Sequence, residues 1–245
     1  MKTLGLENGG ATISIRAARL AIGGTVAGLG FLGALHALSP EFDPAWRMVS
    51  EYANGRYPWV LSLVFACWGI STCALAYAIR GQLRSTSARI GLGLLVLAGL
   101  GEAMAAVFDL NNITMHNVAG VFGMGCLPIA AMIISIKLGR TSEWSGARRS
   151  LLVSADLAWI SVLLLVASFA LMVGTFMATG LPTPTQAPKV LPAGVIGLVG
   201  YANRLLVLSY YLWVIVVARE AIKLGSPKTV RRVVQQGSLT RANEV

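Results

Sequence analysis

Long apolar runs dominate the pattern of this chain, and short polar segments separate them. Each of six runs is long enough to cross the roughly 30 Å hydrocarbon core of a bilayer as a helix. Strands of a membrane barrel would instead alternate apolar and polar residues over about ten positions. The pattern therefore predicts an all-α polytopic membrane protein, a six-transmembrane-helix bundle. The predicted spans cover about residues 17–38, 58–79, 90–108, 114–136, 153–178 and 194–218.

The composition agrees with a membrane protein, because 56% of the residues are hydrophobic, 12% are charged and the mean hydropathy is +0.70. Arg16 and Arg19 lie at the start of the first run, so a cleaved signal peptide is an alternative interpretation of that run. The run is longer than a usual signal core, and Leu35-His36-Ala37 is a poor cleavage site. We expect it to be the first helix.

The net charge of +10 is distributed unevenly, and this distribution argues against a nucleic-acid partner. If the N-terminus is cytoplasmic and six spans alternate, most of the 20 Lys and Arg residues lie on the cytoplasmic side. The opposite side then holds Arg47, Arg56 and Lys189, while Arg204 lies inside the sixth span. The positive-inside rule thus predicts a plasma (inner) membrane protein with both termini in the cytoplasm.

Three regions follow from this topology: a cytoplasmic N-terminus (1–16), the membrane domain (17–218) and a basic cytoplasmic tail (219–245). We expect the tail to lie near anionic headgroups. Membrane lipids, and other membrane-protein subunits as an alternative, are the expected partners. Small residues within the spans predict close helix packing, most simply inside one bundle. They are Gly24, Gly28, Gly91, Gly93, Gly120, Gly123, Gly197 and Gly200.

The stretch PEFDPAWRMVSEYANGRYPW, residues 40–59, gathers charged and aromatic residues between the first two runs. Asp43 is a good N-cap and Pro44 suits the first helical position, while Asn54-Gly55 offers a left-handed stop. A short interfacial helix is therefore predicted over residues 44–53. Its spacing of four places Arg47 and Glu51 on one face.

Two segments carry a family resemblance. HALSPEFDPAWRMVSEYANGRYPWVLSLVFACWGI, with its Ser50-Glu51 pair, and AVFDLNNITMHNVAGVFGM resemble the DUF998 family of bacterial and archaeal membrane proteins. Members commonly have a serine-glutamate pair before the second helix and an aspartate followed by a histidine that opens the fourth. Phe108 stands where the family often has a proline. The resemblance implies a multi-helix membrane architecture and no particular biochemical activity.

Several polar groups are predicted near the outer side of the bundle. Glu102 and Arg204 lie within spans, where an unpaired charge costs about 2.5–3.5 kcal/mol or more, so we expect them to pair. With Glu51 and Asp109 they predict an outward-facing polar cavity that binds a lipid or another amphipathic molecule. The alternative is a purely structural Glu102–Arg204 pair. No catalytic residue is identified.

The same polar residues are compatible with other functions, although no cofactor is expected. Asp109, His116 and His36 could hold a divalent metal, with Glu51 or Glu102 as the base of an intramembrane lipid hydrolase. His36 and His116 could instead be the axial ligands of a b-type haem. Transport and an accessory structural role in a membrane complex are further alternatives. Cys67, Cys73 and Cys126 all fall in predicted spans and indicate neither a disulfide framework nor a zinc site.

Overall fold

The computed structural model describes residues 13–182, 188 and 190–226. Residues 227–245 of the predicted basic tail, Lys189 and most of the predicted cytoplasmic N-terminus lie outside these residues. Within them the fold is all-helical, and six helical segments are long and apolar enough to span a membrane. The predicted fold class is thereby confirmed.

Six spans are built from seven α-helices and the turns that join them. The long helices are α1 (Ile15–Leu38), α2 (Pro58–Ile79), α3 (Thr86–Val107), α6 (Arg148–Ala178) and α7 (Val199–Gly225). The fourth span combines α4 (Ile113–Gly120), a π-helical turn (Val121–Gly125) and α5 (Cys126–Leu138). Short 3₁₀ turns cover Val49–Asn54, Arg80–Gln82, Leu110–Asn112 and Ser145–Ala147.

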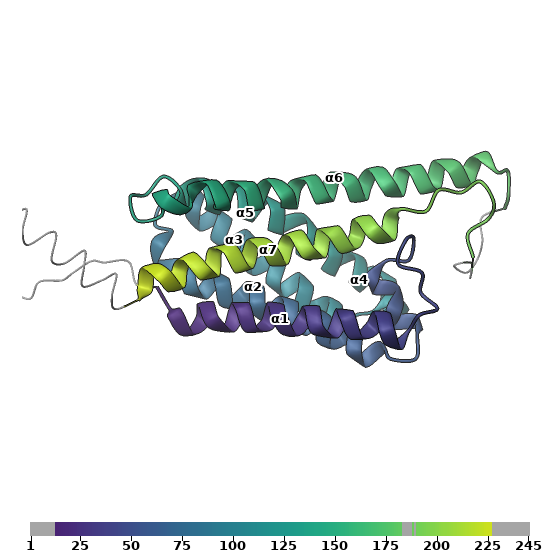
Figure 1. Cartoon of the computed structure of the whole chain (residues 1–245), viewed down its shortest axis with the longest axis horizontal. Helices are drawn as coiled ribbons and strands as arrows, with labels where there is room; N and C mark the ends of the chain where they lie inside the picture. Colours follow the sequence, from purple (N-terminus) through teal and green to yellow (C-terminus); the bar gives the residue numbers. More distant parts are fainter. Residues whose placement is uncertain (1–12, 183–187, 189, 227–245) are drawn as a thin grey trace, which may run out of the picture.

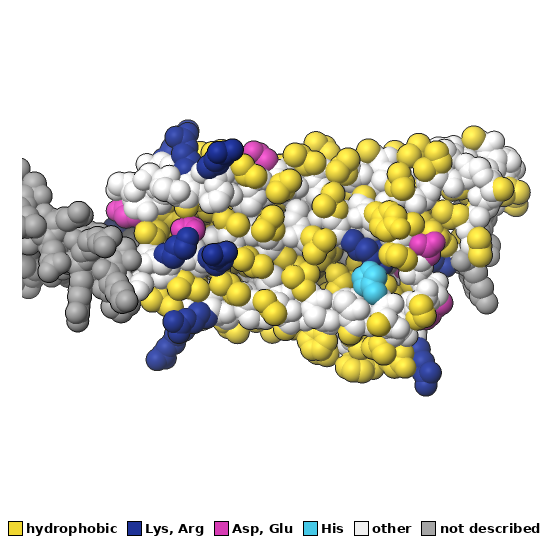
Figure 2. Space-filling view, viewed as in Figure 1, with side chains coloured by type: hydrophobic (Ala, Val, Ile, Leu, Met, Phe, Trp, Pro, Cys, Tyr) yellow, Lys and Arg dark blue, Asp and Glu magenta, His cyan; other side chains and the backbone are white. Residues whose placement is uncertain are grey.

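Neighbouring helices in the sequence pack side by side, and α7 closes the bundle by packing against α1 as well as α6. Helix α1 begins and α7 ends at the same end of the bundle, which we call the terminal end (Figure 1). Lys and Arg side chains gather toward this end, and a broad apolar zone follows (Figure 2). The opposite end carries residues 39–57, which we call the cap segment. We therefore name it the cap end.

Burial differs among the spans and identifies the centre of the bundle. In the spans of α2 and α7, 56% of the most apolar 18-residue stretch is buried inside the protein, whereas in the span of α6 the buried share is 11%. The largest fully buried side chains include Tyr210, Tyr211 and Trp213 of α7. Helix α6 therefore lies at the edge, with most of its apolar surface directed away from the protein, as expected for a lipid-facing helix.

The π-helical turn has a cause in the sequence, namely Pro128. A proline lacks the N–H that would bond to the carbonyl four residues earlier, and its ring crowds that carbonyl. Here the carbonyl belongs to Met124, and the Tyr210 hydroxyl of α7 donates to it at 2.6 Å. The interrupted helix thus recovers its lost hydrogen bond from another span.

Glycines bring α2, α3 and the π turn into backbone contact. A Cβ on Gly69 would lie 2.7 Å from Gly99 O, and one on Gly101 would collide with the backbone of Gly123. Of the predicted packing glycines, Gly24 and Gly123 do face neighbouring helices, whereas a Cβ on Gly93 would meet no described atom within 4 Å. Close packing of backbones fixes this side of the bundle.

Candidate functional site

The cap segment is less helical than predicted. Asp43 caps a turn by accepting from Ala45 N at 2.9 Å, but the only regular structure described between α1 and α2 is the 3₁₀ helix Val49–Asn54. The predicted left-handed stop is also wrong, because Gly55 has a φ of −91°. The prediction of a short helix after the first span is correct, whereas its type and its range of 44–53 are not.

Helix α7 explains this difference, because it forms hydrogen bonds with backbone groups of the cap segment that would pair with one another in an α-helix. Ala45 O accepts from Gly200 N at 2.9 Å and from Tyr201 N at 3.2 Å, which satisfies free N–H groups in the first turn of α7. Val49 N donates to Asn203 Oδ1 at 2.9 Å. The cap segment is therefore held by α7 as a closure of the bundle.

Arg204 fastens the same closure. Its guanidinium donates to Arg47 O at 2.6 Å, to Pro44 O at 3.3 Å and to Gly200 O at 3.0 Å. It also donates to the Tyr52 hydroxyl at 3.2 Å and to His36 Nε2 at 2.7 Å. His36 Nδ1 lies 2.7 Å from Leu32 O, so the arrangement needs the tautomer with its proton on Nδ1. Arg204 thus links α7, α1 and the cap segment.

The predicted pairing of Glu102 with Arg204 is wrong. Glu102 lies on α3 and accepts from Thr72 Oγ1 of α2 at 2.6 Å, while Arg204 faces α1 and the cap segment. Arg204 lies close to the start of α7, because the helix begins at Val199 and not at residue 194. Within residues 194–198, Gly197 approaches Trp46 of the cap segment, whereas Ile196 and Leu198 are exposed.

The other predicted site residues fall into separate surroundings. Glu51 pairs with Arg47 at 2.5 Å and accepts from Met48 N at 2.8 Å, as the four-residue spacing predicted for the pair. Arg47 is 8% exposed and stacks over Trp46, with its Cζ 4.2 Å from the ring centre. Arg47 is therefore buried within the cap end.

Asp109 and His116 lie at the junction of α3 and α4. Asp109 accepts from Asn111 N at 2.9 Å and so caps the short turn before α4, while His116 Nδ1 lies 2.9 Å from Phe108 O. No group of three or more His, Cys, Asp or Glu side chains in the described part of the chain is placed to hold a metal ion. The three cysteines are free. The metal and haem hypotheses stay predictions.

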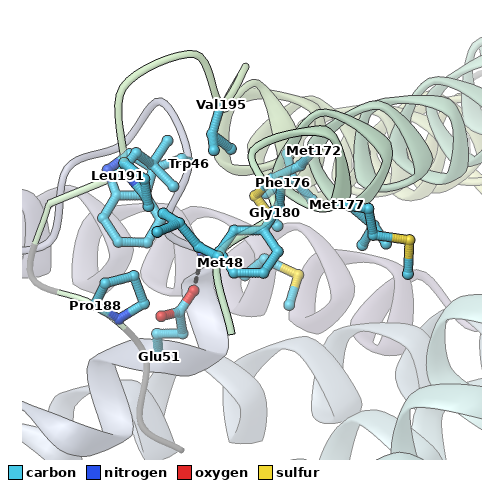
Figure 3. A pocket seen from close by; sticks show the side chains of 14 residues that line it. Trp46, Met48, Glu51, Met172, Phe176, Met177, Gly180, Pro188, Leu191 and Val195 are labelled. Atoms are coloured by element: carbon cyan, nitrogen blue, oxygen red, sulfur yellow. Dashed lines mark hydrogen bonds between the residues drawn. The ribbon is translucent and has the colours of Figure 1, made fainter. Parts of the chain in front are cut away.

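Two cavities lie near the cap end. The first, the cap-end cavity, has a volume of about 590 Å³ between the cap segment, the end of α6, Pro188 and residues 191–199. Figure 3 shows Glu51 hydrogen-bonded to Met48 among apolar side chains, including Trp46 and Phe176. The carboxylate of Glu51 already accepts hydrogen bonds from Arg47 and from Met48 N.

The second, the central cavity, has a volume of about 580 Å³ and is enclosed by α2, α3, α4, the π turn, α6 and α7. Met48 lines both cavities. Of the four residues predicted to share one polar cavity, Glu102 lines the central cavity and Glu51 lines the other; neither Asp109 nor Arg204 lines either one. The four residues therefore do not share either of these two cavities, both of which are largely apolar.

The walls of the central cavity are apolar apart from a few groups. Val121 of the π turn and Val166 of α6 line it and are also 68% and 62% exposed, so the cavity reaches the lateral surface between these segments. At its wall Glu102 Oε1 and Trp68 Nε1 are buried with no hydrogen-bond partner among the described residues. Sequence reasoning missed Trp68 and Thr72, although their spacing of four on α2 places them on one helix face.

Comparison with known proteins identifies the family. Neither curated proteins nor solved structures gave a match to this chain. The family model described as "Protein of unknown function (DUF998)" matches residues 21–220, which include every membrane span at least in large part. This match confirms the resemblance carried by the cap segment and by the junction of α3 and α4. The chain belongs to the DUF998 family.

Proposed function

We propose that this protein binds a lipid or another amphipathic molecule from the membrane in its central cavity. The observation that carries the proposal is an apolar cavity of about 580 Å³ that reaches the lipid-facing surface between Val121 and Val166. Ligand sites usually occupy about 300–1,000 Å³ and are mostly apolar with a few polar groups. The size and lining are thus appropriate for an acyl or isoprenoid chain.

A lateral entrance suits a membrane-borne ligand, because such a molecule need not leave the hydrocarbon phase. Helix α4 packs against α3, whereas α5 packs against both α3 and α6. The side of the bundle between α4 and α6 is therefore the weakly closed one, and the exposed side chains there are apolar. We place the entrance of the ligand on this side.

The test uses photolabelling of the protein in lipid nanodiscs. A membrane probe with a diazirine in its chain should label residues that line the central cavity, such as Leu165 or Leu206, as identified by mass spectrometry of peptides. The Ala105→Phe change fills the cavity and should remove this labelling. Leu163→Phe places the same aromatic side chain on the exposed side of α6 and should leave the labelling intact. Labelling confined to lipid-facing residues in the unchanged protein would refute the proposal.

We also propose that the terminal end faces the cytoplasm, so that the cap end and both cavities lie toward the outer side of the plasma membrane. The support is the excess of cations near the terminal end. In a background without native cysteines, an impermeant thiol reagent added to intact cells should label Arg56→Cys and spare Arg140→Cys, both at exposed positions. The reverse labelling pattern would overturn this orientation.

A further inference from the structure

Two buried polar atoms in the wall of the central cavity lack partners, and they are chemically complementary. Glu102 is 3% exposed and Trp68 is 4% exposed. Glu102 Oε1 and Trp68 Nε1 have no hydrogen-bond partner among the described residues. Buried polar atoms are nearly always bonded, so an orphan atom in the wall of a cavity is available to bond to a group that enters the cavity. One is a carboxyl oxygen and the other an N–H donor.

Both groups line the central cavity, and Thr72 relates them to one face of α2. Trp68 and Thr72 are one turn apart on α2 and share a face. Thr72 Oγ1 donates to Glu102 Oε2 at 2.6 Å, which places the carboxyl of α3 directly against that face. The other carboxyl oxygen, Oε1, is therefore left for a ligand, beside an indole that lines the same cavity.

The surroundings distinguish among possible head groups. Glu102 forms no ion pair within the described residues, and Arg204 is committed to the cap segment. A phosphate or carboxylate head would bring a second acid beside Glu102. An ammonium head would pair with Glu102 but has no acceptor for the indole N–H, and a plain hydrocarbon offers nothing to either group. A hydroxyl both donates and accepts, so it alone among these satisfies both atoms.

We propose that the central cavity selects a neutral lipid with a hydroxyl group, which lies between Glu102 Oε1 and Trp68 Nε1 while its chain extends toward Val121 and Val166. This inference rests on the proposed lipid-binding function and names the class of its ligand: long-chain or isoprenoid alcohols and other uncharged hydroxylated lipids. Charged phospholipids then belong to the surrounding membrane. The head of the ligand is buried inside the protein, near the aromatic rings of Phe65 and Tyr210 that contact Trp68.

The experiment compares competitors in the nanodisc photolabelling assay. The probe is a hexadecanol with a diazirine in its chain, and the competitors are hexadecanol, hexadecane, hexadecylamine and palmitate at equal mole fractions in the membrane. Hexadecanol should compete at least about tenfold better than hexadecane, as expected when a ligand completes hydrogen bonds that the site otherwise lacks. Palmitate and hexadecylamine should also compete less well than the alcohol.

Variants separate hydrogen bonding from packing. Glu102→Leu and Trp68→Phe should each reduce the advantage of the alcohol over the hydrocarbon toward onefold, whereas Glu102→Gln, which keeps a polar oxygen, should retain part of it. Thr72→Val removes the bond to Oε2 but leaves Oε1, and should retain the preference. Size-exclusion profiles establish which variants are folded, and either Glu102→Leu or Trp68→Phe alone is sufficient for the comparison.

The outcomes distinguish the two proposals. If no probe labels the cavity, the proposed function fails. If the cavity is labelled but alcohol, amine and hydrocarbon compete equally, or the amine competes best, only the inference about the hydroxyl is overturned. Equal competition is also the result expected if an enclosed water, and not a ligand, satisfies Glu102 and Trp68.

Discussion

Arg204 at the cap end and Glu102 at the central cavity are both ionisable side chains in helices that are largely apolar. Their hydrogen bonding differs. Arg204 donates to backbone and side-chain acceptors from α1, α7 and the cap segment. Glu102 receives one hydrogen bond, from Thr72, and its second oxygen has no partner among the described residues. A fully bonded group stabilises the fold, whereas an incompletely bonded one is costly unless something binds to it.

This contrast changes how the intramembrane charges are interpreted. An ionisable residue in a span is by default a candidate for function. Arg204 meets that description in the sequence, but its contacts indicate a structural role in holding the cap segment over the bundle. Glu102 meets it in both the sequence and the structure, because its free oxygen lies at a cavity that reaches the membrane. The difference between Arg204 and Glu102 therefore lies in their hydrogen bonding and not in the presence of an ionisable group.

The largest expected effect is that of Arg204→Leu. It should lower the free energy of unfolding by about 3 kcal/mol or more, because Pro44 O and Arg47 O lose a donor and each unmade buried hydrogen bond costs about 1–3 kcal/mol. Unfolding of the purified protein in detergent measures this loss. Arg56→Leu removes an exposed charge at the same end and should change stability by less than about 0.5 kcal/mol. Equal stability of the two variants would show that Arg204 does not hold the cap segment.

The sequence predicted the spans well because a bilayer imposes length and apolarity on each of them. The apolar run 58–79 has the same limits as α2. The run 194–218 does not match α7, which covers Val199–Gly225. Residues 194–198 precede the helix, with Gly197 against Trp46, and the last turns of the helix are amphipathic. A run of apolar residues indicates an apolar environment, in lipid or in protein, but it does not indicate which of these residues are helical.

The site was less predictable, because it depends on how each helix is rotated about its axis. Glu102 and Arg204 were expected to meet since both are costly in lipid, yet each found other partners. Arg47 and Glu51 were placed together correctly, because a spacing of four along one short segment determines their contact. Contacts within one short segment follow from the sequence spacing. Contacts between spans depend on how the helices pack, and close approaches at glycines such as Gly69 and Gly101, which the pattern alone did not single out, determine that packing.

Two adjacent tyrosines of α7 show the same contrast between a bonded and an unbonded buried group. Tyr210 donates to Met124 O at 2.6 Å, while the buried hydroxyl of Tyr211 has no partner among the described residues. Tyr210→Phe should therefore lower the free energy of unfolding by about 1–3 kcal/mol, because Met124 O loses its donor. Tyr211→Phe is the matched control and should be neutral or slightly stabilising.

A double-mutant cycle tests the cause of this effect. Pro128→Ala supplies a backbone N–H that can bond to Met124 O, so Tyr210→Phe should cost less in that background than in the unchanged protein. The difference between the two costs measures how far Tyr210 compensates for the proline. Equal costs in both backgrounds would mean that the hydroxyl acts through packing and that the π turn does not depend on it.

The smallest expected effect has the opposite sign. Glu102→Leu should raise the free energy of unfolding by about 1 kcal/mol, because it replaces a poorly bonded buried carboxyl by an apolar group of similar size. Thr72 Oγ1 can then bond to a carbonyl of its own helix and does not become a new unpaired group. Glu102→Gln keeps a buried polar group and should show no such gain. A clear loss of stability in Glu102→Leu would mean that the carboxyl is fully bonded in the protein, and Glu102 would then resemble Arg204.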